Sequence, residues 1–318
     1  MSKYIVSALG LIKDEFDSAE MNTVLNDFFA QTNSCPRWML YSDYCLDDRS
    51  KPNDVITYVL VPYLGEEQYK EMDDTIHNTQ SSDIKKVRSV NTEFMEYLKS
   101  KGWFSFSFIL DERKNLLGNS HTERVDNVRQ ILDEIKQGVL RWKKNAKDKE
   151  PIDYYDEVIK KLDVELSSLS PKSNIKEMMD ILLITLLGAY CSAMILKRLP
   201  QLEIFGWFPD RDSINEACNQ IAFPMFHVLQ YNHMGGTQYQ FVTTVPDNTV
   251  KPFYDNYNRI ADYICGTLAD YDLQQNVVSK DKFSEVLKGL VADNEHIKMY
   301  RLSVVDGQTH LGGIKVSA

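Results

Sequence analysis

The sequence has little of what marks secreted, redox-active or nucleotide-binding proteins. Its five cysteines are an odd number without a Cys-x-x-Cys pair, which predicts reduced and mostly buried thiols. It contains no Gly-rich phosphate loop, no His-Glu-x-x-His helix and no Gly-x-Ser-x-Gly elbow, so no P-loop, zincin or serine-hydrolase chemistry is indicated. The six histidines are scattered without the spacing of metal ligands.

Positively charged residues are also fewer than negatively charged ones. The 318 residues carry 36 Lys and Arg against 46 Asp and Glu, a formal net charge of −10. That excess argues against a protein that coats nucleic acid through its bulk charge, although a local basic groove is compatible with it. With 43% hydrophobic and 26% charged residues, the composition is that of a chain with a folded core, which excludes collagen-like and disordered proteins.

No targeting signal is apparent. Residues 1–12 lack the basic start and long apolar core of a signal peptide, which predicts a cytoplasmic location. Residues 178–196 are nearly apolar but contain Asp180 near their start, and their length is close to the lower limit for a membrane span. We interpret this segment as a buried core helix and expect no membrane association.

Strand and helix patterns alternate along the chain without repeats or linkers. Residues 4–12 form a short apolar stretch that we leave without an assignment. Apolar and aromatic runs bounded by polar turns predict strands at 38–46, 55–64, 103–110, 202–208 and 238–245, and a closing hairpin of 296–305 and 311–316. Helical periodicity marks 18–30, 66–78, 84–100, 121–146, 154–169, 175–199, 213–231, 254–270 and 280–292. These patterns predict a single α/β domain over 1–318 with a mixed sheet flanked by helices, and a helical insertion or subdomain at 113–170.

Three acidic residues lie at positions where an acid is either unfavourable to bury or well placed to bind a ligand. Asp43 interrupts an aromatic-rich strand, and Asp262 lies in an otherwise apolar helix; burying such an acid is unfavourable unless it is paired or binds a metal. Asp210 follows a predicted strand, at the edge where ligands bind in open α/β sheets. Convergent carboxylates would offer the oxygen ligands that Mg²⁺ or Mn²⁺ prefers.

This order of acids resembles the ribonuclease-H-like fold, and more narrowly an uncharacterised bacterial family, domain of unknown function 3800. Members of that family open with an Asp-Glu-Ser-Gly strand and close with a helix that reads roughly Leu-Gln-Ile-Ala-Asp-Leu-Ile-Ala-Gly; residues 258–266 are similar to the closing motif. The resemblance spans about 37–275 and implies a two-metal phosphodiester hydrolase. It places Asp43, Asp210 (or Asp212) and Asp262 as catalytic metal ligands, with Glu177 or Asp180 as a fourth.

Each acid also has a structural interpretation. Asp43 is compatible with a salt bridge to Arg37, and Asp262 with a buried pair to Arg259 or Lys251. Asp212, directly before Ser213, favours a helix N-cap. Asp111, after the third strand, is a reserve candidate that is more typical of a solvated turn.

A basic group near the end of the 121–146 helix is the candidate nucleic-acid contact. It consists of Arg141, Lys143 and Lys144 around Trp142, and cations interleaved with an aromatic suit phosphate and base contacts. A solvated helix end is the alternative. The resemblance, together with these residues, implies a nuclease that uses Mg²⁺ or Mn²⁺, with nucleic acid as its partner. The rival is a non-catalytic protein-interaction module that keeps the fold with an incomplete acidic site. Two features favour this rival: Asp43 is followed by Tyr44 and Cys45 in place of Glu-Ser, and the net charge is acidic.

Overall fold

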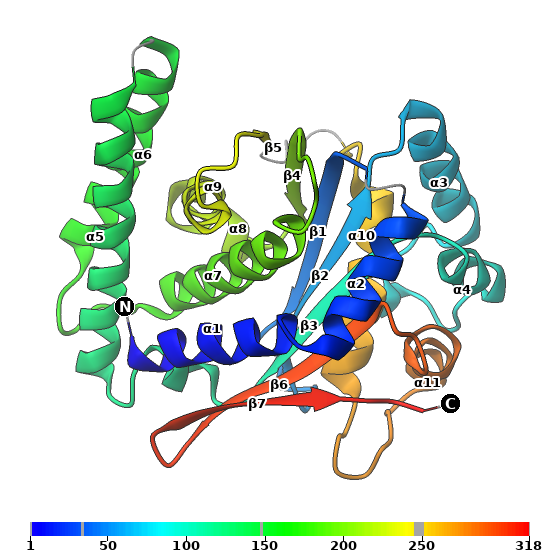
Figure 1. The fold of residues 1–318 in the computed structure, drawn as a ribbon. Helices are drawn as coiled ribbons and strands as arrows, with labels where there is room; N and C mark the ends of the chain where they lie inside the picture. The colour runs from blue at the N-terminus through cyan, green and yellow to red at the C-terminus, as the bar shows by residue number, and fades with distance from the viewer. Residues whose placement is uncertain (1, 33–34, 147–148, 245–250, 318) are drawn as a thin grey trace.

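The fold is described from a computed structural model, over residues 2–32, 35–146, 149–244 and 251–317. Its centre is a seven-stranded mixed sheet in the order β5-β4-β1-β2-β3-β6-β7 (Figure 1). The strands are β1 (Arg37–Cys45), β2 (Asp54–Pro62), β3 (Phe104–Leu110), β4 (Ile204–Pro209), β5 (Gln240–Thr243), β6 (Ile297–Val305) and β7 (Gln308–Ile314).

The pairing of β1 with its neighbours sets the geometry of the middle of the sheet. β1 and β2 form an antiparallel hairpin, whereas β1 and β4 run parallel, with Ser42 opposite Pro209. The Asp210 N–H then donates to the Ser42 carbonyl at 2.8 Å. The residues that follow β4 therefore lie beside the C-terminal end of β1, at the edge where parallel strands present ligand sites.

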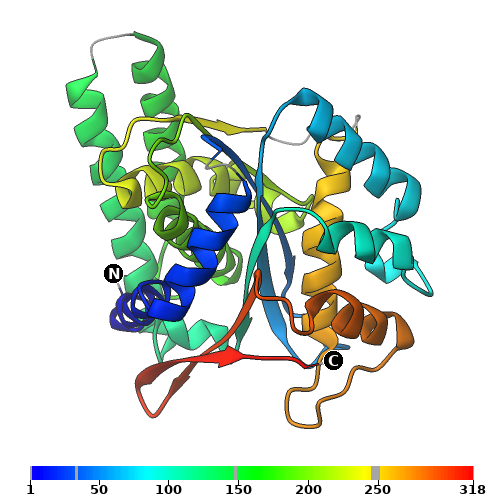
Figure 2. The ribbon, with the colours of Figure 1, turned by 45° about the vertical axis from the view of Figure 1, so that its right-hand side comes forward.

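Helices cover both faces of the sheet (Figures 1 and 2). Because successive strand residues point to opposite faces, Trp38 and Leu40 of β1 pack into one core while Met39 and Tyr41 pack into the other. The first core lies under α1 (Lys3–Phe16), α2 (Ala19–Gln31), α7 (Lys176–Leu196), α8 (Ser213–Gln220) and α9 (Ala222–Met234), with α5 (His121–Asn145) and α6 (Lys149–Ser168) outside them. The second lies under α3 (Glu66–Thr79), α4 (Thr92–Lys99), α10 (Asp255–Asp270), α11 (Asp281–Val286) and the π-helix η3 (Leu287–Val291).

The apolar segment that tests the membrane interpretation is α7. It is the one helix of the described residues that is long and apolar enough to cross a membrane by length and composition, and 83% of that stretch is buried inside the protein. Tyr58 of β2 donates its hydroxyl to the Ile184 carbonyl at 2.5 Å, so α7 packs closely on the sheet. Such burial is typical of a core helix; the expected lack of membrane association stays a prediction.

The predicted α/β class, with a mixed sheet and flanking helices, is confirmed. Segment 113–170 contains η2 (Arg113–Leu117), α5 and α6, and α5 and α6 form a hairpin that extends away from the sheet (Figure 1). The apolar stretch at 4–12 is part of α1, whose buried residues recur at helical spacing. Of the predicted strand 238–245, residue 245 lies outside the described residues.

Two predicted helices are interrupted. The stretch 84–100 divides into η1 (Ile84–Lys86) and α4, because the Asn91 side chain accepts from the Glu93 N–H at 2.8 Å and caps a new helix. The stretch 213–231 divides into α8 and α9 at Cys218 and Asn219, which have left-handed backbone. Pro224 lacks the N–H that a continuous helix would need there, so the chain starts a new helix just before it.

The close contact of α7 with β2 gives a test of the packing. Replacing Gly188 with alanine is expected to lower the free energy of unfolding by about 1–3 kcal/mol, because the added Cβ would lie 2.5 Å from the Tyr58 ring. Gly10→Ala in α1 is the matched control, since nothing lies within 4 Å of its Cβ position and alanine favours the helix by about 1 kcal/mol. Urea denaturation measures both; equal effects at the two glycines would contradict the packing.

Candidate functional site

The three acids singled out in the sequence line one pocket of about 540 Å³. Asp43 lies in β1, Asp210 directly follows β4, and Asp262 lies in α10. All three are half-buried. Among the described residues, no Lys, Arg or His forms an ion pair with any of them.

Local structure explains why these side chains meet. Asp43 shares its strand face with Tyr41, and the Tyr41 ring stacks on Tyr257 of α10 with the centroids 5.1 Å apart. That contact places α10 against β1, so Asp262, further along the same helix, approaches Asp43. The parallel register of β1 and β4 brings in Asp210.

Burial and mutual repulsion disfavour ionisation at this site. The pKa of Asp43 is raised well above its usual value, first by burial and then by the negative charges of Asp262 and Asp210. Burial also raises the pKa of Asp210. The pKa of Asp262 rises to about 7, chiefly through burial, while a hydrogen bond from Ile84 opposes the rise. These carboxyls therefore tend to keep their protons at a pH at which ordinary aspartates have lost theirs.

The alternative partners of these acids are engaged elsewhere. Arg259 pairs with Asp83 and with Asp255 rather than with Asp262. Lys251 also pairs with Asp255, at 3.2 Å. Asp262 instead accepts a hydrogen bond from the Ile84 N–H at 2.7 Å.

The other structural interpretations fare differently. Arg37 begins β1, six residues before Asp43, and its guanidinium lies over the Tyr63 ring, so the predicted salt bridge to Asp43 is absent from the described residues. Asp212 is the N-cap of α8, because its side chain accepts from the Ile214 N–H at 2.7 Å. It also lines the pocket.

The two candidates for a fourth ligand differ in their surroundings. Both Glu177 and Asp180 line the pocket. Glu177 is exposed, whereas Asp180 is buried and accepts two hydrogen bonds from Arg113, at 2.8 and 3.2 Å. Asp180 is therefore already neutralised by a guanidinium, and Glu177 is the more available carboxylate.

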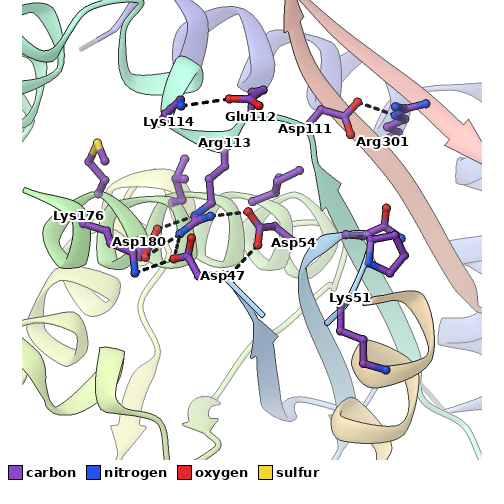
Figure 3. Close-up of a pocket in the computed structure, with 15 residues that line it drawn as sticks. Asp47, Lys51, Asp54, Asp111, Glu112, Arg113, Lys114, Lys176, Asp180 and Arg301 are labelled. Carbon is purple, nitrogen blue, oxygen red and sulfur yellow. Dashed lines mark hydrogen bonds and ion pairs between the residues drawn. The ribbon is translucent and has the colours of Figure 1, made fainter. Parts of the chain in front are cut away.

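Arg113 organises a second, adjacent pocket of about 750 Å³ (Figure 3). Its guanidinium contacts Asp47, Asp54 and Asp180, which come from the end of the β1–β2 hairpin and from α7. Lys176 adds an ion pair with Asp47 at 2.8 Å. In this second group, unlike the first, the carboxylates have cationic partners.

The basic group proposed for nucleic-acid contact lies elsewhere. Arg141, Lys143 and Lys144 lie near the end of α5, in the hairpin that extends from the sheet, and none of them lines the acidic pocket. Lys143 forms an ion pair with Asp156 of α6. The acidic pocket instead has lysines of its own that the sequence reading missed: Lys51, Lys85, Lys176, Lys280 and Lys282. Only chain folding brings these together, because they come from four separate segments.

The donor set has the chemistry of a hard-cation site, since carboxylate oxygens are the ligands that Mg²⁺ and Mn²⁺ prefer. Over residues 2–32, 35–146, 149–244 and 251–317, however, no group of three or more His, Cys, Asp and Glu side chains is placed to hold a metal ion. A divalent ion here would have to draw the carboxylates of Asp43, Asp210 and Asp262 closer together. Comparisons with family models, with curated proteins and with solved structures find no match to this chain.

The raised pKa of Asp262 makes stability depend on pH. The folded carboxyl keeps its proton up to about pH 7, while the unfolded one loses it near 3.9, so the free energy of unfolding falls as pH rises through that range. Asp262→Asn keeps an acceptor for the Ile84 N–H and does not titrate. In metal-free buffer the variant is expected to be more stable than the parent by about 2 kcal/mol at pH 8, allowing for screening at this half-buried site, and equally stable near pH 4. A stability difference that does not grow with pH in urea denaturation would contradict this electrostatic account.

The Arg113 cluster gives a second test. Arg113→Gln leaves Asp54 and Asp180 without a counter-ion and is expected to destabilise the protein by about 3–5 kcal/mol at pH 7. Arg301→Gln is the matched control, because its pair with Asp111 is solvent-exposed and is expected to contribute less than about 1 kcal/mol. Thermal or urea denaturation of the two variants measures the contrast, and a similar loss in both would show that the Arg113 contacts add little.

Proposed function

We propose that this protein is a divalent-metal-dependent nuclease with a ribonuclease-H-like arrangement of its acidic residues. The observation that carries the proposal is that Asp43, Asp210 and Asp262 line one pocket without a cationic partner among the described residues. Their raised pKa values mean that a cation is needed to hold all three ionised at neutral pH.

The topology around the pocket supports the resemblance seen in the sequence. An acid in β1, the β1–β2 hairpin, an acid after the parallel neighbour β4 and an acid in α10 follow one another in the order that the resemblance implies. Nucleic acid as partner, a cytoplasmic location and the absence of a membrane anchor belong to the same proposal.

The chain's own residues have distinct parts in this account. Asp43, Asp210 and Asp262 would hold Mg²⁺ or Mn²⁺, and Glu177 is an exposed carboxylate of the same pocket that would supply a fourth contact. The Ile84 N–H fixes one oxygen of Asp262, which leaves the other oxygen free to bind. When bound, divalent ions lower the pKa of an attacking water and stabilise the leaving oxygen of a phosphodiester.

Two observations favour the alternative, a non-catalytic interaction module that keeps this fold. The three carboxylates do not form a closed ligand group in the described residues. The residues after Asp43 are Tyr44 and Cys45, so no second acid directly follows the first. Both observations are expected for a protein that binds no metal at this pocket.

Nuclease assays separate these functions. The full chain is incubated with single-stranded DNA, duplex DNA, RNA and RNA–DNA hybrid, each in EDTA, Mg²⁺ and Mn²⁺. The proposal predicts metal-dependent cleavage of at least one substrate, reduced at least about 100-fold in Asp43→Asn and in Asp262→Asn, because losing a metal ligand costs at least as much as losing an outer-shell partner.

Asp111→Asn is the control, since Asp111 pairs with Arg301 outside the acidic pocket. It should cleave like the parent. Cleavage that persists in EDTA, or that survives both pocket substitutions, would overturn the assignment. Absence of cleavage on all four substrates would favour the interaction module.

A further inference from the structure

The pocket that holds the three acids is also lined by five lysines. Three of its five lysines are engaged: Lys51 pairs with Asp270 at 2.7 Å, Lys176 with Asp47 at 2.8 Å, and Lys282 donates to backbone carbonyls. The other two, Lys85 and Lys280, are exposed. Neither forms an ion pair within the described residues.

Lys85 is carried on a turn that is fixed from both sides. On one side the Ile84 N–H donates to Asp262 of α10. On the other, the ammonium of Lys282, a residue that is only 6% exposed, donates to the carbonyls of Ile84, Lys85 and Val87 at 2.5, 3.3 and 3.0 Å. Lys85 therefore directly follows the residue whose N–H binds Asp262.

Lys280 lies on the neighbouring segment, at the N-cap of α11. Burial lowers the pKa of Lys282, and the positive charges of Lys280 and Lys51 lower it further, while the negative charges of Asp262 and Asp270 raise it. The acids and the lysines thus line one pocket together. An anionic ligand would be repelled by ionised acids and attracted by the lysines.

We propose that Lys85 and Lys280 bind phosphate groups of a single nucleic-acid strand whose backbone enters the pocket towards Asp43, Asp210 and Asp262. The identity of the ligand rests on the proposed nuclease function. Two separate flexible ammonium groups suit a polyanion that carries one phosphate per nucleotide, since each lysine binds phosphate as a point charge. A pocket of about 540 Å³ is within the usual range of ligand sites, so it has room for a nucleotide-sized part of the strand.

This assignment moves nucleic-acid contact away from the basic group on α5. Arg141, Lys143 and Lys144 do not line the pocket, and Lys143 is paired with Asp156. In the strand-binding account these three residues have no contact with the scissile phosphate. Arg141 and Lys144 are exposed, so they provide a matched pair of surface cations for comparison.

The experiment measures binding of a fluorescent single-stranded DNA oligonucleotide by anisotropy, in Mg²⁺, between about 50 and 200 mM salt. All proteins are full-length and carry Asp43→Asn, which keeps the strand intact and removes one repelling charge. Lys85→Ala with Lys280→Ala is compared with Arg141→Ala with Lys144→Ala, which removes the same number of positive charges. Thermal denaturation checks that both double variants fold like the parent.

The proposal predicts that the Lys85/Lys280 pair weakens binding about ten-fold at low salt. It should also reduce the slope of log affinity against log salt by about 1.4, that is 0.7 for each of two phosphates lost. The Arg141/Lys144 pair should leave both quantities unchanged. Equal weakening by the two pairs, an unchanged slope in the Lys85/Lys280 pair, or no binding by the Asp43→Asn parent would overturn it.

Cleavage assays keep this test separate from the proposed function. Strand binding that depends on Lys85 and Lys280, without metal-dependent cleavage by the unsubstituted protein, would retain the binding site and reject the nuclease. Metal-dependent cleavage that needs Asp43 but is unchanged by substitution of Lys85 and Lys280 would retain the nuclease and reject the binding site.

Discussion

Packing of α10 against β1 is the contact on which the candidate site depends. Tyr257 stacks on Tyr41 across this interface, and the same helix carries Asp262 to the side of the sheet on which Asp43 points. The parallel pairing of β1 with β4 supplies Asp210. Without that helix position, Asp262 would be separated from Asp43 and Asp210.

Two neighbouring groups of three carboxylates differ in whether a cationic side chain balances their negative charge. Asp47, Asp54 and Asp180 are all held by the guanidinium of Arg113, which offsets the cost of placing them together. Asp43, Asp210 and Asp262 have no such cation among the described residues, and their pKa values rise instead. The chain can evidently position an arginine against an acidic cluster. Leaving the second cluster without one costs stability, and binding of an external cation would offset that cost.

The sequence predicted most of the elements because their patterns are local. Apolar and aromatic runs separated by a polar turn located β1 and β2, and the pair Pro209-Asp210 marked the end of β4. The acids were recognisable because each is costly in an apolar segment. The prediction failed at the break between η1 and α4. Asn91 caps the new helix there, and the turn before it is held by Lys282, which donates to its backbone carbonyls from almost 200 positions away in the sequence.

The same limit applies to the cations of the site. Arg141, Lys143 and Lys144 attracted attention because they are consecutive or nearly so, whereas the lysines that line the pocket come from segments far apart in the sequence. Likewise, nothing local showed that Asp180 is held by Arg113 while Glu177 is exposed. Charges that are neighbours in the sequence can be recognised from the sequence alone, whereas charges that line one pocket are recognised only in the folded structure.

The central claim is that the acidic pocket binds divalent metal, and a crystal structure grown with Mn²⁺ tests it most directly. The account predicts anomalous density between Asp43, Asp210 and Asp262, with the three carboxylates drawn closer together than in metal-free crystals and with density lost in Asp43→Asn. Absence of Mn²⁺ from this pocket at saturating concentration, with the carboxylates unmoved, would contradict it.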